Sequence, residues 1–363
     1  MAKPHLAAVL EDRLNRAKAE RVLARGWVSQ FIPYTGYGSA TQARILARLL
    51  LTREPGEEAA ADVTASEIEL YHADRARRGW RSFMTTPGTD QPVTIRIGDR
   101  EVRTRTDRAG IIDLAVADHG LEPGWQTVTL SSPRAEDAEA SVLVVDPDAT
   151  FGLISDIDDT VIKTMLPRPM IAAWNTFVKH EGTRSPVPGM ATMYRELLAE
   201  QPGAPIVYVS TGAWNTVPQL TRFLRDNGYP AGPLLMTDWG PTNTGWFRSG
   251  QDHKRACLHR LARELPGIEW LLVGDDGQHD PVIYGEFAEQ RPERVRAIAI
   301  RRLSATEQLL SHFTPLAQDD LEPARRKLLS VPVCRASDGY GLLRLLKVAL
   351  EDLPVPSDVV VER

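Results

Sequence analysis

The spacing of apolar residues divides the chain into parts with different structural signatures. Residues 4–25 place leucines, valines and alanines at near-helical intervals, with arginines and lysines between them, which predicts an amphipathic helix. From Trp27 to about Asp146, short runs alternate apolar and polar residues, as strands do. The clearest of these runs are 91–98, 101–106, 111–116, 125–130 and 140–145. Residues 43–50 fit a helix or a strand; their neighbours favour a strand, and this part as a whole predicts an antiparallel β-sandwich.

After Asp146, apolar strand runs alternate with segments of helical periodicity. The strand runs are 152–155, 205–210, 234–237, 268–274 and 295–300. The helical segments are 219–227 and 255–264, followed by helices near 306–311, 322–329 and 341–350. This alternation predicts an α/β domain with a parallel sheet and helices on both of its faces. The predicted division is an N-terminal helix over 1–26, a β-sandwich domain over 27–147, an α/β domain over 148–353 and a tail over 354–363.

Composition limits the classes of protein that the chain can represent. Its 363 residues, of which 42% are hydrophobic and 25% charged, suit a folded protein of two domains. A net charge of −5 gives no reason to expect nucleic acid as a partner. The two cysteines, Cys257 and Cys334, lie far apart without metal-type spacing, which indicates free thiols in a reducing compartment.

The location of the protein is predicted from what the sequence contains near its start and along its length. Charged residues interrupt the first apolar stretch before it reaches the length of a secretory signal. No run of about 18 apolar residues occurs, so we expect no transmembrane span and a soluble, cytoplasmic protein. The basic amphipathic helix over 4–25 could contact an anionic membrane surface peripherally, although packing on its own domain is the more common use of such a helix.

Carboxylates follow the first apolar strand of the α/β part. The run 152–155 is followed by Asp156 and Asp158, which would share one side of an extended chain while Ile157 turns back to the core. Two acids this close repel each other unless a cation is present or one of them keeps a proton. A hard cation such as Mg²⁺ would resolve the conflict. For an isolated pair of acids, an exposed acidic turn is the simpler interpretation. The residues at the ends of the other strands therefore decide between a turn and a metal site.

Because ligands bind beyond the carboxyl ends of strands in open parallel sheets, the residues after each apolar run are candidate site residues. The run 205–210 ends in Ser210, which Thr211 and Gly212 follow. This segment offers a hydroxyl and a flexible backbone whose amides can face a phosphoryl oxygen. The alternative interpretation is that Ser210 simply caps a helix. After 268–274, the acids suited to holding Mg²⁺ are Asp275, Asp276 and Asp280, in a sequence that also reads as a turn.

One lysine completes the set of candidates. Lys254 stands near the start of a predicted helix, where the helix dipole disfavours a cation. Taken alone it could be an ordinary surface lysine. Beside two groups of acids and a phosphate, it would neutralise the charge of a transferred phosphoryl group.

Together these residues resemble the four motifs of the haloacid-dehalogenase (HAD) superfamily of phosphotransferases: Asp156-x-Asp158-x-Thr160, Ser210, Lys254 and Gly274-Asp275-x-x-x-x-Asp280. More closely, residues 155–161, 209–214, 252–254 and 273–284 look like the catalytic domain of the actin-patch-type phosphatidate phosphatases, and Asp338-Gly-Tyr-Gly fits that family too. The resemblance covers about 151–350. It implies a HAD-like doubly wound parallel sheet with a small cap. Since bacterial members commonly carry a β-rich domain ahead of this one, it also implies a bacterial member.

The resemblance implies a role for each matching residue. Asp156 would attack phosphorus to form an aspartyl-phosphate, and Asp158 would protonate the leaving alcohol and then activate water. Ser210 and Lys254 would hold phosphoryl oxygens. Mg²⁺ would be bound by the Asp156 side chain, the Asp158 main-chain carbonyl, Asp275 and a second acid of the last motif. That second acid is Asp276 or Asp280, and the family spacing favours Asp280.

The implied activity is that of a Mg²⁺-dependent phosphomonoester hydrolase acting on phosphatidate or a related lipid phosphate. One alternative is a phosphatase of small soluble phosphometabolites, and another is a β-sandwich binding module with an accessory phosphatase domain. The short cap segment 167–202 could place Trp174 and Phe177 over the site or in the core. Three more tryptophans could line a rim for an acyl chain or a sugar, or be buried: Trp214, Trp239 and Trp246.

Overall fold

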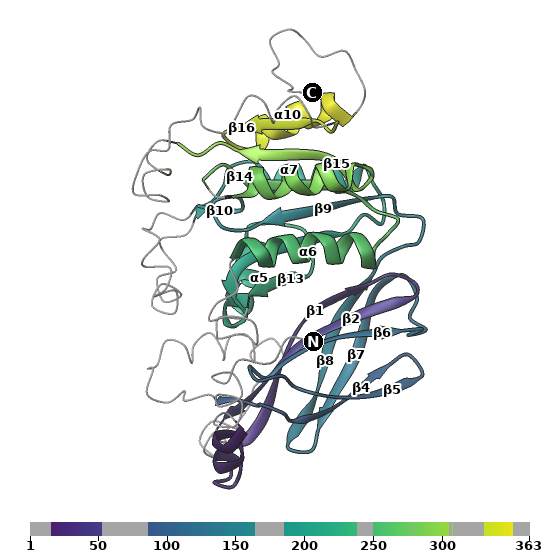
Figure 1. The fold of residues 1–363 in the computed structure, drawn as a ribbon, viewed down its shortest axis with the longest axis vertical. Coiled ribbons are helices and arrows are strands. Elements are labelled where there is room, and N and C mark those ends of the chain that lie inside the picture. Colours follow the sequence, from purple (N-terminus) through teal and green to yellow (C-terminus); the bar gives the residue numbers. More distant parts are fainter. Residues whose placement is uncertain are drawn as a thin grey trace. The chain divides into compact units, whose positions relative to one another are not determined.

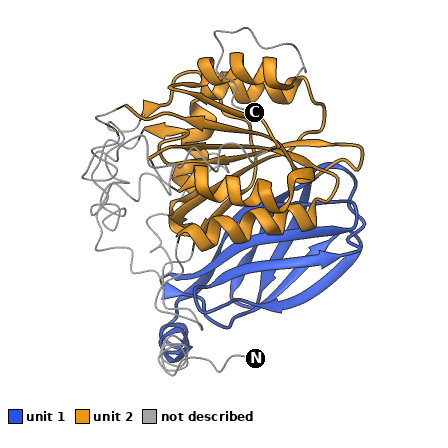
Figure 2. Cartoon of the chain, turned by 45° about the horizontal axis from the view of Figure 1, so that its top comes forward, with its two compact units in different colours: residues 1–144, 240–247 blue, residues 145–239, 248–363 orange. Residues whose placement is uncertain are grey.

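The computed structural model describes residues 16–52, 86–163, 185–237, 250–277, 279–304, 307 and 330–350. Of these, the residues up to Val144 form one compact unit and those from Val145 onward form another (Figure 2). Several predictions fall outside the described residues. They concern Trp174, Phe177, Trp239, Trp246, the helix near 322–329, most of the helix near 306–311 and the tail 354–363.

The first unit contains eight strands that are hydrogen-bonded into one sheet (Figure 1). They are β1 (Val28–Gly38), β2 (Gln42–Thr52), β3 (Thr86–Pro87), β4 (Pro92–Ile97), β5 (Arg100–Arg105), β6 (Ile111–Ala117), β7 (Gly124–Ser132) and β8 (Ala135–Val144). The order is β3-β2-β1-β8-β7-β4-β5, with β6 paired to β2. All described pairs are antiparallel except β1 with β8. The strands predicted from alternation are confirmed, including the ambiguous segment 43–50, which lies in β2.

Alternating residues of these strands fill one apolar core. In β4, Val93, Ile95 and Ile97 are buried while the residues between them reach solvent. They belong to a cluster with buried residues of β1, β2, β6, β7 and β8. The described part of the N-terminal helix, residues 16–23, packs Ala19 and Val22 against Leu51 of β2. This segment therefore buries its apolar side on its own unit.

The second unit is built on a six-stranded sheet in which every neighbouring pair is parallel. In spatial order the strands are β13 (Leu234–Thr237), β12 (Ile206–Ala213), β9 (Phe151–Asp156), β14 (Glu269–Asp275), β15 (Val295–Arg301) and β16 (Val333–Ala336). All six residues of β9 are buried, as expected for a central strand covered on both faces. The predicted α/β class with a parallel sheet is confirmed. A separate two-stranded ribbon pairs β10 (Ile162–Lys163) with β11 (Ser185–Pro186).

The described α-helices of this unit lie between its strands, except for the last one, which follows β16. They are α4 (Met190–Ala199), α5 (Val217–Asp226), α6 (Gly250–Glu264), α7 (Asp280–Gln290) and α10 (Gly339–Leu350). Helices α6 and α7, labelled in Figure 1, pack against each other and against strands β12 to β15. Helix α4 packs against α10. The sequence predicted α5, α6 and α10 but not α4, α7 or β16. No helix among the described ranges has the length and apolar character that crossing a bilayer requires.

The chain reverses its direction of travel across this sheet next to β9. From β9 it moves outward through β12 to β13, then returns to place β14 on the other side of β9 and continues to β16. Where such an order reverses, the loops leaving adjacent strands diverge and open a crevice at the carboxyl ends. The carboxyl ends of β9, β12 and β14 are therefore the expected position of a ligand site.

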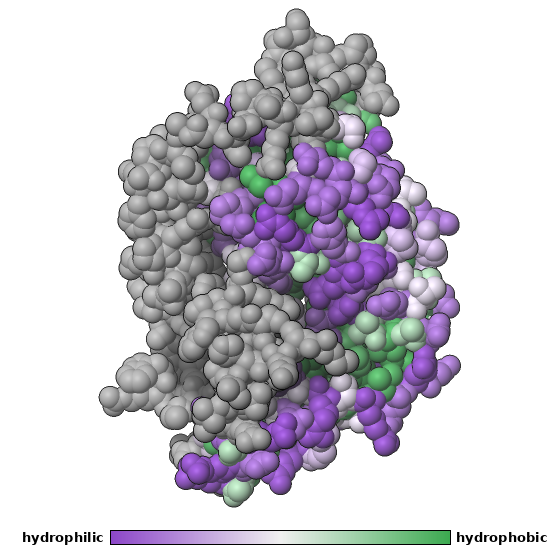
Figure 3. Space-filling model, in the orientation of Figure 1, coloured by the Kyte–Doolittle hydropathy of each residue, from purple (hydrophilic) through white to green (hydrophobic). Residues whose placement is uncertain are grey.

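The surface of the described residues is mostly hydrophilic in the view of Figure 3, and apolar residues show only in limited areas. Among the described residues, two large hydrophobic side chains are exposed, Trp125 of β7 and Tyr340 of α10. Trp214, a candidate for an exposed rim, is buried.

Both cysteines are free and buried, which gives a direct test of this fold. Cys257 lies on α6 and Cys334 on β16, and burial raises the pKa of the Cys334 thiol to about 12. Since the thiolate is the reactive form, we expect neither thiol to react with Ellman's reagent at pH 8 in the native protein. In denaturant both should react within minutes. Rapid labelling of either cysteine without denaturant would contradict its position in the sheet–helix core.

Candidate active site

The candidate site begins where β9 ends. Asp156 is the last residue of this strand and is 1% exposed. The chain then turns sharply, because the Ile157 carbonyl accepts hydrogen bonds from the amides of Val161 at 2.9 Å and Ile162 at 3.1 Å. Asp158 lies in this turn rather than in an extended strand, so the predicted alternation of side chains does not continue past Asp156. Ile157 is nevertheless fully buried, as expected.

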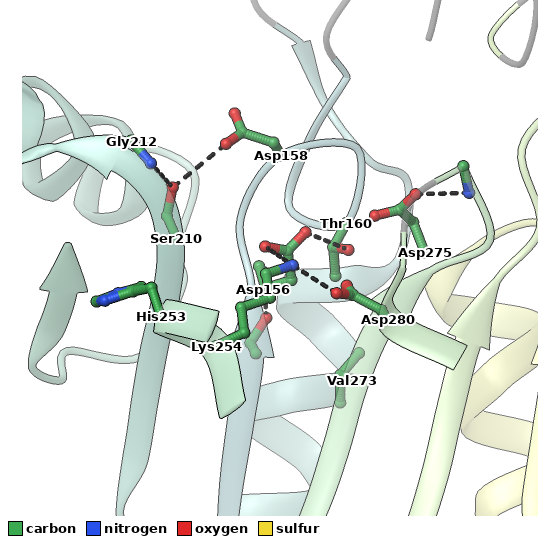
Figure 4. A network of polar contacts seen from close by, with 12 residues as sticks. Asp156, Asp158, Thr160, Ser210, Gly212, His253, Lys254, Val273, Asp275 and Asp280 are labelled. Atoms are coloured by element: carbon green, nitrogen blue, oxygen red, sulfur yellow. Dashed lines mark hydrogen bonds and ion pairs between the residues drawn. The ribbon is translucent and has the colours of Figure 1, made fainter. Parts of the chain in front are cut away.

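Lys254 reaches the Asp156 carboxylate from helix α6. Its ammonium lies 2.8 Å from Asp156 Oδ1 and 2.5 Å from Asp280 Oδ1 (Figure 4). The lysine is 3% exposed, which rules out the alternative of a surface lysine. Helix α6 connects β13 to β14 and runs back along the sheet, so a residue in its first turns is brought to the carboxyl edge beside β9.

The last sequence motif brings two more buried carboxylates to the same place. Asp275 ends β14 and Asp280 is the first residue of α7, and both are fully buried. Single carboxylate oxygens of Asp156, Asp275 and Asp280 all lie within 4.8 Å of one another. Asp276 instead accepts a hydrogen bond from the Leu303 amide at 2.8 Å. The geometry therefore places Asp280, and not Asp276, with the other two acids.

The Ser-Thr-Gly segment lies beside Asp158. The Ser210 hydroxyl donates to Asp158 Oδ2 at 3.3 Å and accepts from the Gly212 amide at 2.9 Å (Figure 4). The predicted strand run ended at Ser210, but β12 continues through Thr211 and Gly212 to Ala213. Thr211 lies against the first residue of α6, since a Cβ added to Gly250 would come within 2.7 Å of the Thr211 methyl carbon. The segment thus contacts both Asp158 and the start of the helix that carries Lys254.

Two contacts that hold Asp156 were not anticipated. The Thr160 hydroxyl donates to Asp156 Oδ2 at 3.2 Å. The Ser155 hydroxyl donates to the Asp156 carbonyl at 2.6 Å and lies 2.6 Å from the Tyr194 hydroxyl. Because the serine has one proton to donate, Tyr194 is the donor to Ser155. Thr160 was visible in the first motif without a role. Tyr194 of α4 gave no sequence signal, because its partner is 39 residues away.

Burial dominates the electrostatics of this cluster of three carboxylates and one ammonium. Burial raises the pKa of Asp156 to about 8, although the Lys254 ammonium opposes the rise. Burial and the Asp280 carboxylate also raise the pKa of Asp275 well above its usual value. Burial alone would lower the pKa of Lys254, but Asp156 and Asp280 outweigh it and raise that pKa. One ammonium cannot offset three buried carboxylates, so further positive charge would stabilise their ionised forms.

The oxygens of the cluster are suited to a hard cation. No donor among the described residues reaches Asp275 Oδ2 or Asp280 Oδ2, although both atoms are buried. A buried carboxylate oxygen without a hydrogen bond is costly unless a cation binds it. Because every side-chain ligand offered here is an oxygen, the donor set fits Mg²⁺ or a similar divalent ion better than a thiolate-seeking metal.

The charge imbalance predicts that neutralising Asp275 stabilises the protein when no metal is bound. The raised pKa means that the folded state holds this proton more tightly than the unfolded chain, so ionised Asp275 destabilises the fold above its ordinary pKa of 3.8. In EDTA at pH 7.5 we expect Asp275→Asn to melt above the wild type, by roughly 3–8 °C. Calorimetry with and without Mg²⁺ measures this, and the variant should lose any gain that Mg²⁺ gives the wild type.

The matched control is Glu289→Gln, which neutralises an exposed acid of α7 and should leave the melting temperature and its response to Mg²⁺ unchanged. A metal-free Asp275→Asn variant that melts below the wild type would contradict the electrostatic argument.

The described residues that match a family model lie within the second unit. Residues 151–302 match the family model described as "Phosphatidate phosphatase APP1, catalytic domain". Phosphatidate phosphatase APP1 of Saccharomyces cerevisiae is 28% identical over 152 residues, which are 42% of this chain and 26% of that protein. An uncharacterized protein of Schizosaccharomyces pombe is 28% identical over 153 residues, 42% of this chain and 25% of that protein. The chain thus spans about a quarter of the length of these relatives.

Solved structures add little. A carbohydrate acetylesterase from Xanthomonas citri aligns over 76% of this chain and 70% of its own at 7% identity, with a TM-score of 0.25, which is too low to inform on the fold. The family match, in contrast, covers the whole buried cluster from Asp156 to Asp280. It confirms the expectation of a phosphatase-type catalytic domain, similar to that of the APP1 phosphatidate phosphatases, in residues 151–302.

Proposed function

We propose that this protein is a divalent-metal-dependent phosphomonoester hydrolase that works through an aspartyl-phosphate. The observation that carries the proposal is the position of the Lys254 ammonium, within 2.8 Å of Asp156 and 2.5 Å of Asp280 at the carboxyl end of the central strand. Phosphoryl transfer asks a protein chiefly for positioning and for neutralisation of charge, and this cluster can supply both. The match to the APP1 catalytic domain supports the same reaction class.

In the proposed reaction, a carboxylate oxygen of Asp156 attacks phosphorus and the bond from phosphorus to the ester oxygen breaks. Asp158 gives a proton to the departing alcohol. Asp158 then takes a proton from water, whose oxygen attacks the same phosphorus, and the bond to Asp156 breaks to release inorganic phosphate. The partial exposure of Asp158 suits this role, because both the leaving group and the water must reach it.

The other candidate residues hold charge in this scheme. Lys254 binds and neutralises phosphoryl oxygens next to the nucleophile, and the Ser210 hydroxyl with the Thr211 and Gly212 backbone orients them. Asp156, the Asp158 carbonyl, Asp275 and Asp280 would hold Mg²⁺, whose charge lowers the repulsion between the phosphate and the carboxylates. The two buried acid oxygens that no described donor reaches support Asp275 and Asp280 as ligands.

We also propose the finer fold assignment. The order β13-β12-β9-β14-β15-β16, with all pairs parallel, supports a HAD-like doubly wound sheet. Of the small cap expected over 167–202, residues 167–184 lie outside the described residues, so the cap stays a prediction. The shared apolar core of the first unit supports a β-sandwich. The β-rich part ahead of the catalytic part supports membership in the bacterial branch. The predicted division at 26, 147 and 353 is kept as part of this proposal.

The proposed substrate is phosphatidate or a related lipid phosphate, because the family match and the yeast relative are both named for phosphatidate phosphatase. A lipid substrate requires access to a membrane surface, so we propose a cytoplasmic protein with peripheral membrane contact.

The nucleophile is tested by an isosteric change. Asp156→Asn keeps the size of the side chain but removes its nucleophilic oxygen, so hydrolysis of p-nitrophenyl phosphate with Mg²⁺ should fall about a thousandfold or more. Phosphate release measures the loss, and Asp148→Asn, an exposed acid on the segment before β9, should retain full activity. Appreciable turnover by Asp156→Asn would exclude the aspartyl-phosphate route.

The substrate class is tested by comparing phosphatidate in mixed micelles with a panel of soluble sugar and nucleotide monophosphates. We expect kcat/KM for phosphatidate to exceed that for the best soluble ester by about 100-fold, since acyl chains add binding energy that soluble esters lack. The Asp156→Asn variant shows which turnover belongs to this site. A soluble ester hydrolysed faster than phosphatidate would replace the lipid assignment with the metabolite phosphatase alternative.

A further inference from the structure

The turn that follows Asp156 is held by side chains from distant parts of the chain. Asp159, at its centre, has a left-handed backbone with φ of 58°, and its amide donates to the Ile162 carbonyl at 2.8 Å. A non-glycine residue in this region carries backbone strain that surrounding contacts must offset. The orientation of this turn matters because Asp158 immediately precedes Asp159 and Thr160 follows it.

Arg301 contacts this turn from a distant strand. It is the last residue of β15, is 2% exposed and lies two strands from β9 in the sheet. Its Nη1 donates to the Asp159 carbonyl at 2.6 Å, across 142 positions of sequence. A buried guanidinium that donates to a main-chain carbonyl is a strong, directional contact.

The guanidinium is itself fixed from two further sides. Its Nη2 lies 2.6 Å from Glu307 Oε1, and its Nε donates to the Ser337 carbonyl at 3.3 Å. The other oxygen of Glu307 accepts from the Ser304 amide at 2.8 Å. These contacts orient the planar group and supply the charge that a buried arginine requires.

We propose that Arg301, held by Glu307, is a positioning residue that sets the Asp158–Thr160 turn and thereby the acid–base group of the reaction. The inference rests on the proposed function for the role of Asp158. Arg301 bonds to the main-chain carbonyl of Asp159, next to the residue that must meet the leaving group. Tyr229 holds the same turn further along, since its hydroxyl donates to the Val161 carbonyl at 3.1 Å. Movement of the turn would displace Asp158, whereas Asp156 keeps its place at the end of β9 and loses only its hydrogen bond from Thr160.

Different leaving groups separate this role from a general loss of stability. An alkyl phosphate releases a strongly basic alcohol that needs a proton from Asp158, whereas p-nitrophenyl phosphate releases a weakly basic phenolate that does not. For Arg301→Gln we expect kcat/KM to fall about 100-fold with the alkyl ester and less than about 10-fold with p-nitrophenyl phosphate. A purely structural role would lower both by the same factor.

A second measurement, amide hydrogen exchange, reports the stability of the turn independently of enzyme activity. In Arg301→Gln, the amides of Val161 and Ile162, which bond to the Ile157 carbonyl, should exchange hydrogen at least about tenfold faster than in the wild type. Glu307→Gln keeps the arginine but weakens its anchor. Glu307→Gln should change the ester preference and the amide exchange in the same direction as Arg301→Gln, by a smaller factor. It replaces Arg301→Gln in the test should that variant not fold. The control Arg296→Gln, on the same strand with a half-exposed side chain, should change neither.

The outcomes distinguish the two proposals. Equal losses on both esters, with unchanged exchange of the turn in a folded Arg301→Gln or Glu307→Gln variant, would overturn the positioning role and leave the phosphatase assignment intact. A wild-type protein that hydrolyses neither ester with Mg²⁺ would overturn the proposed function. In that case the proposed role of Arg301 in positioning Asp158 is also overturned. Amide hydrogen exchange would still decide whether Arg301 holds the turn.

Discussion

The buried ion pairs of Lys254 with Asp156 and Asp280 determine how the second unit must be built. Three carboxylates and one ammonium are withdrawn from water within a few ångströms of one another. Such a group destabilises a fold unless its charges are balanced and its hydrogen bonds are made. The hydrogen bonds from Thr160 and Gly277 satisfy one oxygen each on Asp156 and Asp275, and Lys254 serves two of the acids. The remaining negative charge favours the binding of a cation.

The parallel sheet makes this arrangement possible because different residues of each strand stabilise the fold and form the site. Strands β9 and β14 are mostly apolar ahead of their terminal aspartates, and the register between β9, β14 and β15 brings their carboxyl ends to one edge. The apolar length of each strand contributes the burial that offsets the cost of the charged ends. Asp156 and Asp275 are the terminal residues of their strands, so each carboxylate takes its position from a rigid element rather than from a loop.

Much of this could be predicted from the sequence, because the signals were local. A buried strand that ends in Asp156, or a period-two run such as 92–97, identifies itself within a few residues. Local reasoning missed α7. The segment after β14 indicates acids suited to Mg²⁺, or a turn, but nothing in it marks the helix that Asp280 and the following proline begin. Local reasoning also failed for β16, whose four residues carry too little pattern and form a strand because β15 lies beside them. Thr211 and Gly212 were expected beyond the strand, since glycine and hydroxyl residues usually end one, but both lie within β12.

Three contacts that the sequence could not reveal share one physical feature. The Ser155 hydroxyl holds the carbonyl of Asp156, Arg301 holds that of Asp159, and Tyr229 holds that of Val161. Each fixes a main-chain atom of the segment that carries the candidate catalytic acids and does not occupy their carboxylates. Further donors on these carboxylates, beyond those that already bond to them, would compete with the cation and the substrate for the remaining oxygens. Because a carbonyl acceptor is offered by every residue, nothing in the local sequence marks which one is used. Only the three-dimensional structure identifies Arg301, 142 positions away, as the residue that supports the turn.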